Sequence, residues 1–215
     1  MRRLVRLLVL ACLAMLASPG QAEDDKPAPR SVFLIANEDM ADPRFRETVV
    51  LVTRHGRSRS TIGVIVNRPF AVTLDQVFPE FSRATDHRLH YGGPVAQGQI
   101  VFLVRGDTPP KAAIALTERL FISSDGESLR RLLEAATPDS RLRVFRGFAS
   151  WAPNQLEAEI DRGDWYLLPV DTDALFNDPL DALWPKLWRR ATQVMVRAPA
   201  PVLRVEFAAW RPALR

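Results

Sequence analysis

Residues 47–67, ETVVLVTRHGRSRSTIGVIVN, hold the pattern that decides the fold. Residues 47–54 are rich in β-branched side chains and continuously apolar at their centre, which predicts a strand covered on both faces. Residues 61–67 predict a second strand, because alternate apolar side chains fall on one face. The polar stretch between them predicts a loop, so the two strands form an antiparallel hairpin. Gly63 has no side chain to pack within its strand, which indicates that another backbone comes close.

The rest of the chain mixes strands and helices. Further strands are predicted at residues 31–36, 89–91, 99–105, 120–123, 142–151 and 165–170. The clearest helix is predicted at residues 125–136, where Ser124 and Glu127 fit a capping box. Short helices are predicted at residues 73–78, after Thr73 as N-cap, and at residues 153–161. Strands and helices do not alternate strictly, so the pattern favours the α+β class.

Prolines and acids predict where further elements begin and end. Pro69 ends the second strand of the hairpin, and Pro185 argues against an unbroken helix over residues 180–190. Asp171 or Asp178 is expected to cap a short helix that follows the last predicted strand.

The first 22 residues have the order of a secretory signal peptide. Three arginines among the first six residues precede an apolar stretch at residues 7–17. The motif Gly20-Gln21-Ala22 then places small residues where a signal peptidase cuts. We therefore expect cleavage after Ala22 and export of the mature protein, to the periplasm in a Gram-negative cell.

The alternative to cleavage after Ala22 is a lipoprotein anchored through Cys12, although almost no apolar region would precede that cysteine. Cleavage after Ala22 would remove Cys12 together with the leader. Cys12 is the only cysteine, so a cleaved chain has neither a disulfide nor a thiolate nucleophile. Residues 23–30 are polar, contain two prolines and are expected to form a linker. Residues 31–191 are expected to form one domain.

Charge is unevenly distributed along the chain. The full chain carries 29 Lys and Arg against 25 Asp and Glu, a net charge of +4, and loss of the leader's three arginines leaves +1. Residues 192–215 form a basic C-terminal extension that can attract phosphates or anionic lipid. The extension can instead dock on residues 23–185, where acidic side chains outnumber basic ones, or stay solvated. An exported protein at +1 lacks the broad basic surface of a nucleic-acid-binding protein, so no nucleic-acid partner is expected.

Motifs that identify a reaction do not occur. The chain has no phosphate-binding glycine loop, no dinucleotide-binding glycine motif and no nucleophile elbow. His87 and His90 are three residues apart, but no third ligand lies nearby, so neither a metal site nor a cofactor is predicted. No serine lies on a recognisable strand-to-helix elbow, so the catalytic residues are left unknown.

Four clusters in a fixed order carry a resemblance to a known family. They are Asp42-Pro43-x-Phe45 followed by Thr48-Val49-Val50-Leu51, Gly63-Val64-Ile65-Val66-Asn67-Arg68-Pro69, Tyr91-Gly92-Gly93-Pro94-Val95, and Gly147-Phe148-Ala149-Ser150-Trp151-Ala152-Pro153-Asn154-Gln155-Leu156-Glu157. In this order and spacing, over roughly residues 31–191, the chain resembles the YqgE/AlgH family. Trp165, the Leu175-Phe176 pair and Trp184 also fit that family's C-terminal pattern.

The resemblance implies a bent, barrel-like sheet and supplies no reaction. Together with the pattern above, it predicts an α+β fold in which a largely antiparallel or mixed sheet is flanked by short helices. The chain departs from the family by its leader, by its C-terminal extension, and at Ser150, Ala152 and Asn154, where family members tend to have glycine.

Seven residues of these clusters are candidates for one anion-binding site. An amide and a guanidinium at a strand end, a glycine turn, and a strand-to-helix turn can each hold a carboxylate or phosphate. The candidates are Asn67, Arg68, Gly92, Gly93, Trp151, Gln155 and Glu157. The alternative is structural, because turns and cores are the commoner reason for such residues.

These observations favour a non-catalytic, exported binding or regulatory protein that recognises a partner or a small anionic ligand. One alternative is a hydrolase in which Glu157 or a histidine acts as general base near Asn67 and Arg68. Another is a protein that associates with the membrane surface through its basic extension.

Overall fold

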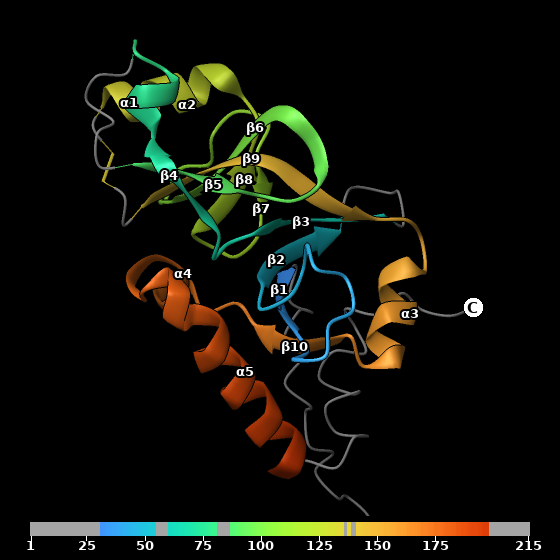
Figure 1. Ribbon diagram of the computed structural model, residues 1–215. Coiled ribbons are helices and arrows are strands. Elements are labelled where there is room, and N and C mark those ends of the chain that lie inside the picture. The colour runs from blue at the N-terminus through green and yellow to red at the C-terminus, as the bar shows by residue number, and fades with distance from the viewer. Residues whose placement is uncertain (1–30, 55–59, 81–86, 136, 139–140, 198–215) are drawn as a thin grey trace, which may run out of the picture.

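The computed structural model describes residues 31–54, 60–80, 87–135, 137–138 and 141–197 (Figure 1). The strands of these residues are β1 (Ser31–Ala36), β2 (Val49–Arg54), β3 (Thr61–Ile65), β4 (Pro69–Thr73), β5 (Arg88–Tyr91), β6 (Val95–Arg105), β7 (Ile114–Ala115), β8 (Leu120–Ser123), β9 (Leu142–Trp151) and β10 (Trp165–Pro169). The helices are α1 (Leu74–Val77), α2 (Gly126–Glu134), α3 (Gln155–Arg162), α4 (Thr172–Asn177) and α5 (Leu180–Arg197). The leader, the linker and the extension beyond residue 197 lie outside the described residues.

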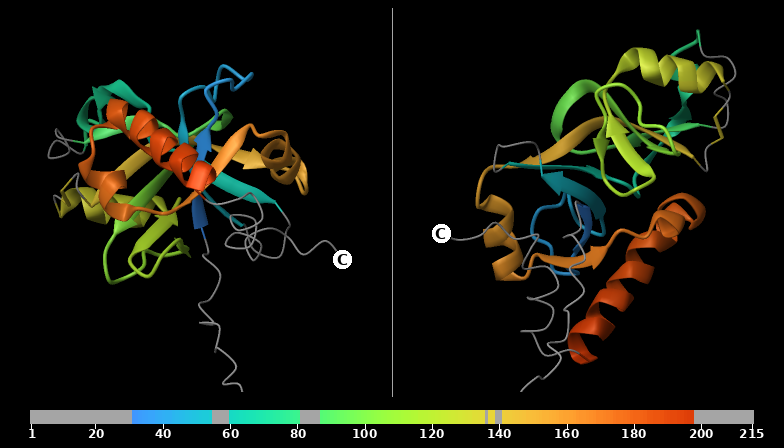
Figure 2. Two further views of the ribbon diagram at one scale, coloured as in Figure 1. Left: turned by 90° about the horizontal axis from the view of Figure 1, so that it is seen from below. Right: turned by 180° about the vertical axis from the view of Figure 1, so that it is seen from behind.

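One curled sheet forms the frame of the molecule. Its main path runs β10-β1-β2-β3-β9-β6-β8-β7, with β5 paired to β9 and β4 paired to β5. All these pairs are antiparallel except β5–β9, which is parallel. The sheet bends into a half-barrel flanked by short helices, as both further views show (Figure 2). The predicted α+β fold with a bent, mixed sheet is confirmed.

Strand β9 joins the two halves of this sheet. Its first half pairs with β5 and β6, and its last three residues pair with β3. Between them, Gly147 has a φ of 69°, which favours glycine over residues with a side chain. A Cβ at Gly147 would lie 2.8 Å from the carbonyl oxygens of both Gly93 and Val95. Glycine at this point therefore lets β9 turn from one half to the other.

The predicted hairpin is present as β2 and β3. The register pairs Val52 with Gly63. A Cβ on Gly63 would lie 2.6 Å from Val52 Cγ1 and 2.7 Å from the Leu51 carbonyl oxygen, which confirms the close approach inferred for this glycine. The predicted loop between the strands falls largely on residues 55–59, outside the described residues.

The first two strands are buried on both faces. Val49 and Leu51 of β2 pack in one apolar cluster with α4 and α5, whereas Val50 and Val52 pack in another with Leu156 of α3. Figure 1 shows α5 and α3 on opposite sides of these strands, consistent with the two clusters. A third cluster lies under α1 and α2.

One sequence prediction about a helix end is wrong. Ser124 does not cap α2, because the Asp125 carboxylate accepts the backbone N–H of Ser128 over 2.9 Å. The second strand of the hairpin ends before Pro69, as predicted, and Pro69 then begins β4, where it pairs with His90. Proline is tolerated there because β4 pairs with β5 alone among the described strands, so one side of β4 requires no N–H donors.

The expected interruption at Pro185 is also wrong, because α5 runs through it. The missing N–H removes one helical hydrogen bond, the one to Asp181. Burial of Leu183, Leu187 and Ala191 on the face that packs against β1 and β10 offsets this loss. Of the two predicted helix caps, Asp171 caps α4 by accepting the Ala174 N–H. None of the helices among the described residues is sufficiently long and apolar to span a bilayer.

Candidate functional site

A pocket of about 390 Å³ lies where the loop after β1 meets α3 and the ends of β9 and β10. The loop contributes Asp42, Arg44 and Phe45, and the start of β6 contributes part of one wall. Trp151 ends β9 and Trp165 begins β10, so the connection through α3 brings both rings to the same place. We call this cavity the Trp151–Trp165 pocket.

Three aromatic rings line the base of the pocket. The centroids of Phe45 and Trp151 are 6.0 Å apart, and those of Phe45 and Trp165 are 5.6 Å apart. Trp151 and Trp165 meet edge to face at 6.2 Å. Both indoles are almost fully buried, whereas Phe45 is half-buried. Such pairs stabilise the fold beyond the area they bury.

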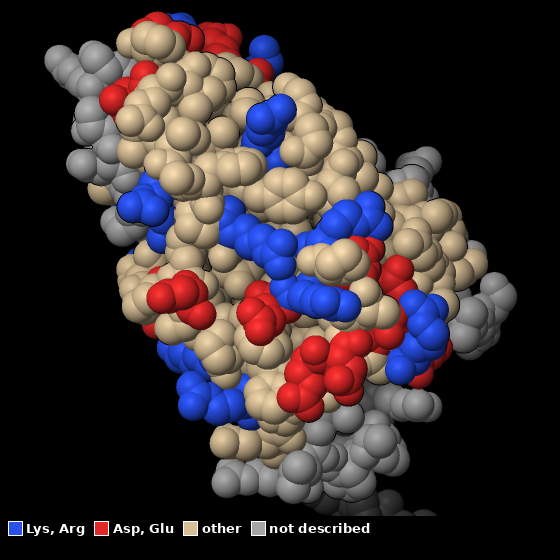
Figure 3. Space-filling view, viewed as in Figure 1, with Lys and Arg blue, Asp and Glu red and all other residues tan. Residues whose placement is uncertain are grey.

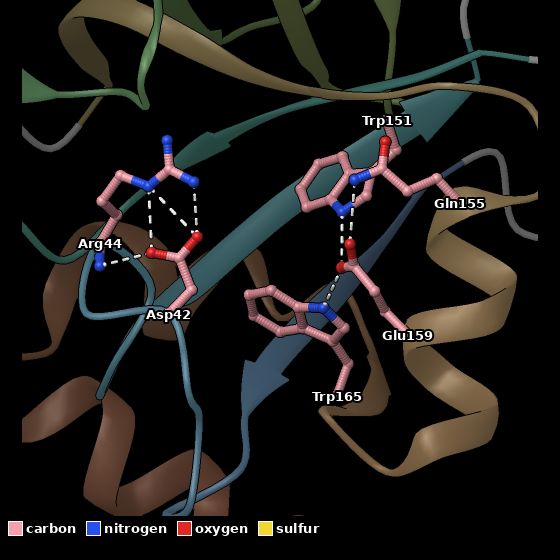
Figure 4. A network of polar contacts seen from close by, with 6 residues as sticks. All are labelled: Asp42, Arg44, Trp151, Gln155, Glu159 and Trp165. Carbon is pink, nitrogen blue, oxygen red and sulfur yellow. Dashed lines mark hydrogen bonds and ion pairs between the residues drawn. The ribbon is translucent and has the colours of Figure 1, made fainter.

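Glu159 joins the two indoles (Figure 4). Its Oε2 accepts the Nε1–H of Trp151 over 2.8 Å and that of Trp165 over 2.9 Å. Its Oε1 accepts an N–H of the Gln155 amide over 3.0 Å. Glu159 and Gln155 lie one turn apart on α3, so the helix presents both side chains on one face.

The sequence around α3 explains how these groups are placed. Leu156 is fully buried and fixes the rotation of the helix, so Gln155 and Glu159 face the pocket. The Gln155 side-chain oxygen accepts the Ala152 N–H, which ties the start of α3 to the end of β9. Gly163, with a φ of 86°, ends the helix and allows the chain to turn into β10.

Two ion pairs lie at the rim. Arg44 binds Asp42 with an N–O distance of 2.6 Å, and Arg162 binds Asp164 with one of 2.5 Å. The side-chain hydrogen bond from Arg44 lowers the pKa of Asp42 below its ordinary value of 3.8. Each arginine at the pocket therefore already has a carboxylate partner.

Only two of the seven predicted site residues line this pocket, namely Trp151 and Gln155. Asn67 lies outside it and holds the backbone: its Oδ1 accepts the Val49 N–H and its Nδ2 donates to the Glu47 carbonyl, each over 2.9 Å. Arg68 donates to the Arg46 carbonyl over 2.6 Å. Both side chains thus act on the chain immediately after Phe45 and position that wall of the pocket.

Gly92 and Gly93 are placed by close packing against β9. A Cβ on Gly92 would lie 2.1 Å from the Gly147 carbonyl oxygen, and one on Gly93 would lie 2.4 Å from the Phe148 carbonyl carbon. The Gly92 N–H donates to the Arg146 carbonyl over 2.9 Å, so it does not point into an anion nest. The following residues, Pro94 and Val95, line the Trp151–Trp165 pocket.

Glu157 and the histidines lie away from the pocket lining. Glu157 is half-buried in the first turn of α3, where its negative charge interacts favourably with the helix dipole. His87 and His90 are buried, and a ring nitrogen of each lies within hydrogen-bond distance of a backbone carbonyl, that of Thr137 and that of Val144. Within the described ranges, no group of three or more His, Cys, Asp or Glu residues could hold a metal ion.

Glu159 is the central residue that sequence reasoning missed. The only available signal was its position four residues after Gln155 on a predicted helix. Phe45 and Trp165 were recognised as parts of the family pattern but not as parts of a site. Their roles depend on contacts between segments far apart in the chain, which periodicity does not reveal.

The electrostatics of the pocket are mixed. Its lining includes three carboxylates (Asp42, Glu159 and Asp164) and two arginines, with neither histidine, lysine nor cysteine among the described residues that line it. On the face shown in Figure 3, positive and negative side chains lie next to one another and no single sign dominates. The arrangement can hold a polar group against aromatic rings.

The chain matches a known protein family along most of its length. A family model described as AlgH-like matches residues 33–195. A UPF0301 protein of Chlorobaculum tepidum is 33% identical over 156 residues, which cover 72% of this chain and 82% of the relative. A UPF0301 protein of Nocardia farcinica is 33% identical over 183 residues, which cover 79% of this chain and 78% of the relative.

Two solved structures share the fold. The AlgH protein from Pseudomonas aeruginosa matches with a TM-score of 0.64 and 26% identity, over 79% of this chain and 93% of that one. Protein DIP2367 from Corynebacterium diphtheriae matches with a TM-score of 0.59 and 28% identity, over 84% of this chain and 92% of that one. The curled sheet with its short helices is therefore common to all three chains.

Proposed function

The chain belongs to the AlgH-like family, and we propose that it is a non-catalytic binding protein whose recognition site is the Trp151–Trp165 pocket. The observation that carries this proposal is the hydrogen bonding of the Glu159 carboxylate. Both of its carboxylate oxygens already accept hydrogen bonds from fixed indole and amide N–H groups. A carboxylate held in this way serves recognition and packing better than proton abstraction.

The other polar groups of the pocket support the same proposal. Among the described residues of the lining, Ser150 carries the one hydroxyl, and no histidine or lysine accompanies it to act as its base. Asp42 and Asp164 are each held by an arginine. The pocket therefore has features of a binding cavity, namely a mostly apolar base with a few fixed polar groups.

We further propose that binding takes place outside the cytoplasm, in a regulatory role at the cell envelope. Support for export comes from the leader pattern of residues 1–22, with cleavage after Ala22. Contact with the membrane surface through residues 192–215 stays a prediction, because residues 198–215 lie outside the described part of the chain.

Heteronuclear NMR of the mature protein tests this proposal. The indole N–H signals of Trp151 and Trp165 report on the pocket directly, because both groups donate to Glu159. The probes are five classes of small molecule: alkylamines, alkylguanidines, carboxylates, phosphates and neutral sugars. We expect at least one class to shift both signals in a saturable way, and we expect each probe to remain chemically unchanged.

Two outcomes would contradict a binding role. One is that none of the five classes shifts the two indole signals. The other is turnover of an ester, phosphate or peptide substrate that is abolished by Glu159→Gln but kept by Glu157→Gln, a matched change on the same helix outside the pocket lining.

A further inference from the structure

The charges that line the Trp151–Trp165 pocket leave one carboxylate without a cation. Arg44 is bound to Asp42 and Arg162 to Asp164, with contact distances of 2.6 and 2.5 Å. Glu159 forms no ion pair with another described residue, and its three hydrogen-bond donors are all neutral N–H groups. Its negative charge is therefore solvated by dipoles but not neutralised within the described lining.

The hydrogen bonds of Glu159 also leave room for one more donor. An ionised carboxylate offers about four acceptor positions, two on each oxygen. The two indoles occupy Oε2, whereas Gln155 is the only described residue that donates to Oε1. Gln155 is exposed, so this side of the carboxylate lies near solvent. The open acceptor position therefore belongs to Oε1, the oxygen beside the exposed Gln155 side chain.

The aromatic rings around Glu159 favour a positive charge. Each indole directs its N–H edge, the positive part of the ring, at the carboxylate. Both indoles are almost fully buried, so the aromatic surface open to a ligand is the half-buried ring of Phe45, which lies 5.6 Å from Trp165 and 6.0 Å from Trp151. A cation beside an aromatic face gains about two- to thirtyfold in affinity, depending on how far it is desolvated.

We propose that the Trp151–Trp165 pocket binds a cationic organic group, an alkylammonium or an alkylguanidinium, through the Glu159 carboxylate and the surrounding aromatic rings. This inference rests on the proposed binding function and names the class of ligand. The pocket volume of about 390 Å³ lies within the range of small-ligand sites and suits an alkyl chain with one charged head.

An anion is disfavoured by the same geometry. To bind Arg44 or Arg162, an anion must displace Asp42 or Asp164, each of which already holds its arginine at contact distance. It would also enter a lining that has three carboxylates and two arginines, so the surrounding field opposes it. The charge of the pocket thus selects against the small anion expected from the sequence.

The cationic group has two sources, a free small amine or guanidine and the side chain of a Lys or Arg in another protein. The two share one chemistry at Glu159 and differ in what surrounds the charged head. The experiment therefore contains an arm for each source.

Affinity is measured by titrating the mature protein and following the indole N–H signals of Trp151 and Trp165. The probes are n-butylguanidinium and n-butylammonium, with n-butylurea as the neutral isostere and acetate and inorganic phosphate as anions. A second arm uses the capped peptide acetyl-Gly-Arg-Gly-amide and its citrulline counterpart. We expect n-butylguanidinium to bind at least about tenfold more tightly than n-butylurea, because the isostere lacks the charge that Glu159 selects.

Variants separate this site from general surface charge. Glu159→Gln is expected to lower the affinity for n-butylguanidinium at least about tenfold, whereas Glu157→Gln, which removes the same charge from the same helix, is expected to change it less than about twofold. Phe45→Leu keeps an apolar side chain at the pocket and removes one ring, so it is expected to weaken binding about two- to thirtyfold. It serves as the independent variant if Glu159→Gln proves poorly folded.

The outcomes distinguish failure of the proposed cation selectivity from failure of the proposed binding function. Equal affinity for n-butylurea, or equal losses in Glu159→Gln and Glu157→Gln, overturns selection for a cation. Shifts caused by acetate or phosphate alone also overturn it, but they leave the pocket as a binding site. If none of the probes and none of the classes tested above shifts the indole signals, both proposals fail. Tighter binding of the arginine peptide than of n-butylguanidinium assigns the group to a protein partner, and the reverse assigns it to a small molecule.

Discussion

Trp151 and Trp165 donate their indole N–H groups to the same oxygen of Glu159, although β9 and β10, the strands that carry them, are not neighbours in the sheet. The two rings meet edge to face with centroids 6.2 Å apart. One carboxylate on α3 therefore ties together both ends of the connection that contains it. The same carboxylate lies in the wall of the pocket, so stability and recognition are linked at this point.

Replacement of Glu159 is expected to destabilise the fold. Glu159→Gln keeps one acceptor oxygen but removes the charge from three hydrogen bonds, which should lower the free energy of unfolding by about 1–3 kcal/mol. Glu159→Ala should cost more, because it leaves two indole N–H groups without their acceptor. Urea unfolding measures both. Glu157→Gln is the control, with an expected change within about 0.5 kcal/mol, and an equal loss in the control would remove the special role of Glu159.

Asn67 is expected to support the pocket at a distance. Asn67→Ala removes two hydrogen bonds that hold the backbone at Glu47 and Val49, and Glu47 adopts a φ of 52°, which a non-glycine residue rarely does. The free energy of unfolding should fall by about 1–3 kcal/mol.

NMR line broadening of the Phe45 ring signals in Asn67→Ala checks whether loss of these two hydrogen bonds also affects the pocket wall. Asn67→Asp retains the acceptor for the Val49 N–H and loses only the donor, so it should cause a smaller change than Asn67→Ala. Unchanged Phe45 signals in Asn67→Ala would show that Asn67 does not position the wall.

Gly63 is expected to tolerate no side chain. In Gly63→Ala the new Cβ would meet both a side chain and a backbone oxygen of β2 at less than 3 Å, so the hairpin must move. Overpacking of this kind costs about 1–3 kcal/mol. The matched control is Gly98→Ala in β6, where a Cβ meets nothing within 4 Å. Thermal unfolding should show a clear loss for Gly63→Ala and little change for Gly98→Ala, and equal behaviour of the two would contradict the hairpin packing.

The Asp42–Arg44 pair is expected to make a small contribution that depends on pH. The hydrogen bond from Arg44 lowers the folded-state pKa of Asp42 below 3.8, so the pair stabilises the protein above the unfolded pKa. That contribution is lost as the pH falls through the lowered folded-state pKa. It stays small because the Arg44 side chain is 59% exposed and solvent screens the pair.

Unfolding free energies of the wild type and Asp42→Asn, measured from about pH 6 to about pH 2, check this dependence. Their difference should be constant near neutrality and should shrink below the ordinary aspartate range. A difference that does not change over the whole range would exclude the ion pair as its origin.

Export is tested by the mass of the purified protein. The leader pattern predicts that the full chain, expressed in a bacterial host and recovered from the envelope fraction, begins at Glu23. Intact-mass spectrometry distinguishes this from the uncleaved chain and from a lipid-modified chain that begins at Cys12. Recovery of the uncleaved protein from the cytoplasm would remove the proposed location.

Local patterns were sufficient for most of the fold. The β2–β3 hairpin was predictable because β-branched residues, alternation and Gly63 all favoured the same arrangement. The misassigned positions are those where a local rule was overridden. At Pro185, burial of the apolar face of α5 outweighs one missing hydrogen bond. At α2, two neighbouring residues could both cap the helix, and only the backbone geometry selects Asp125.

The candidate site was less predictable for a physical reason. Asn67 and Arg68 have the chemistry of anion ligands, but backbone carbonyls and an N–H group at residues 46–49 engage their polar groups. Glu159 has the sequence context of a solvated helix position, and its role appears only when β9 and β10 bring two indoles to it. Periodicity does not reveal such contacts between residues that are distant in sequence.

The position of a bound n-butylguanidinium ion tests the central claim most directly. Intermolecular nuclear Overhauser effects should connect its methylene protons with ring protons of Phe45 and with the indole of Trp151 or Trp165. The absence of a saturable complex, or contacts only with residues outside the Trp151–Trp165 pocket, would contradict the claim that this pocket recognises a cationic group.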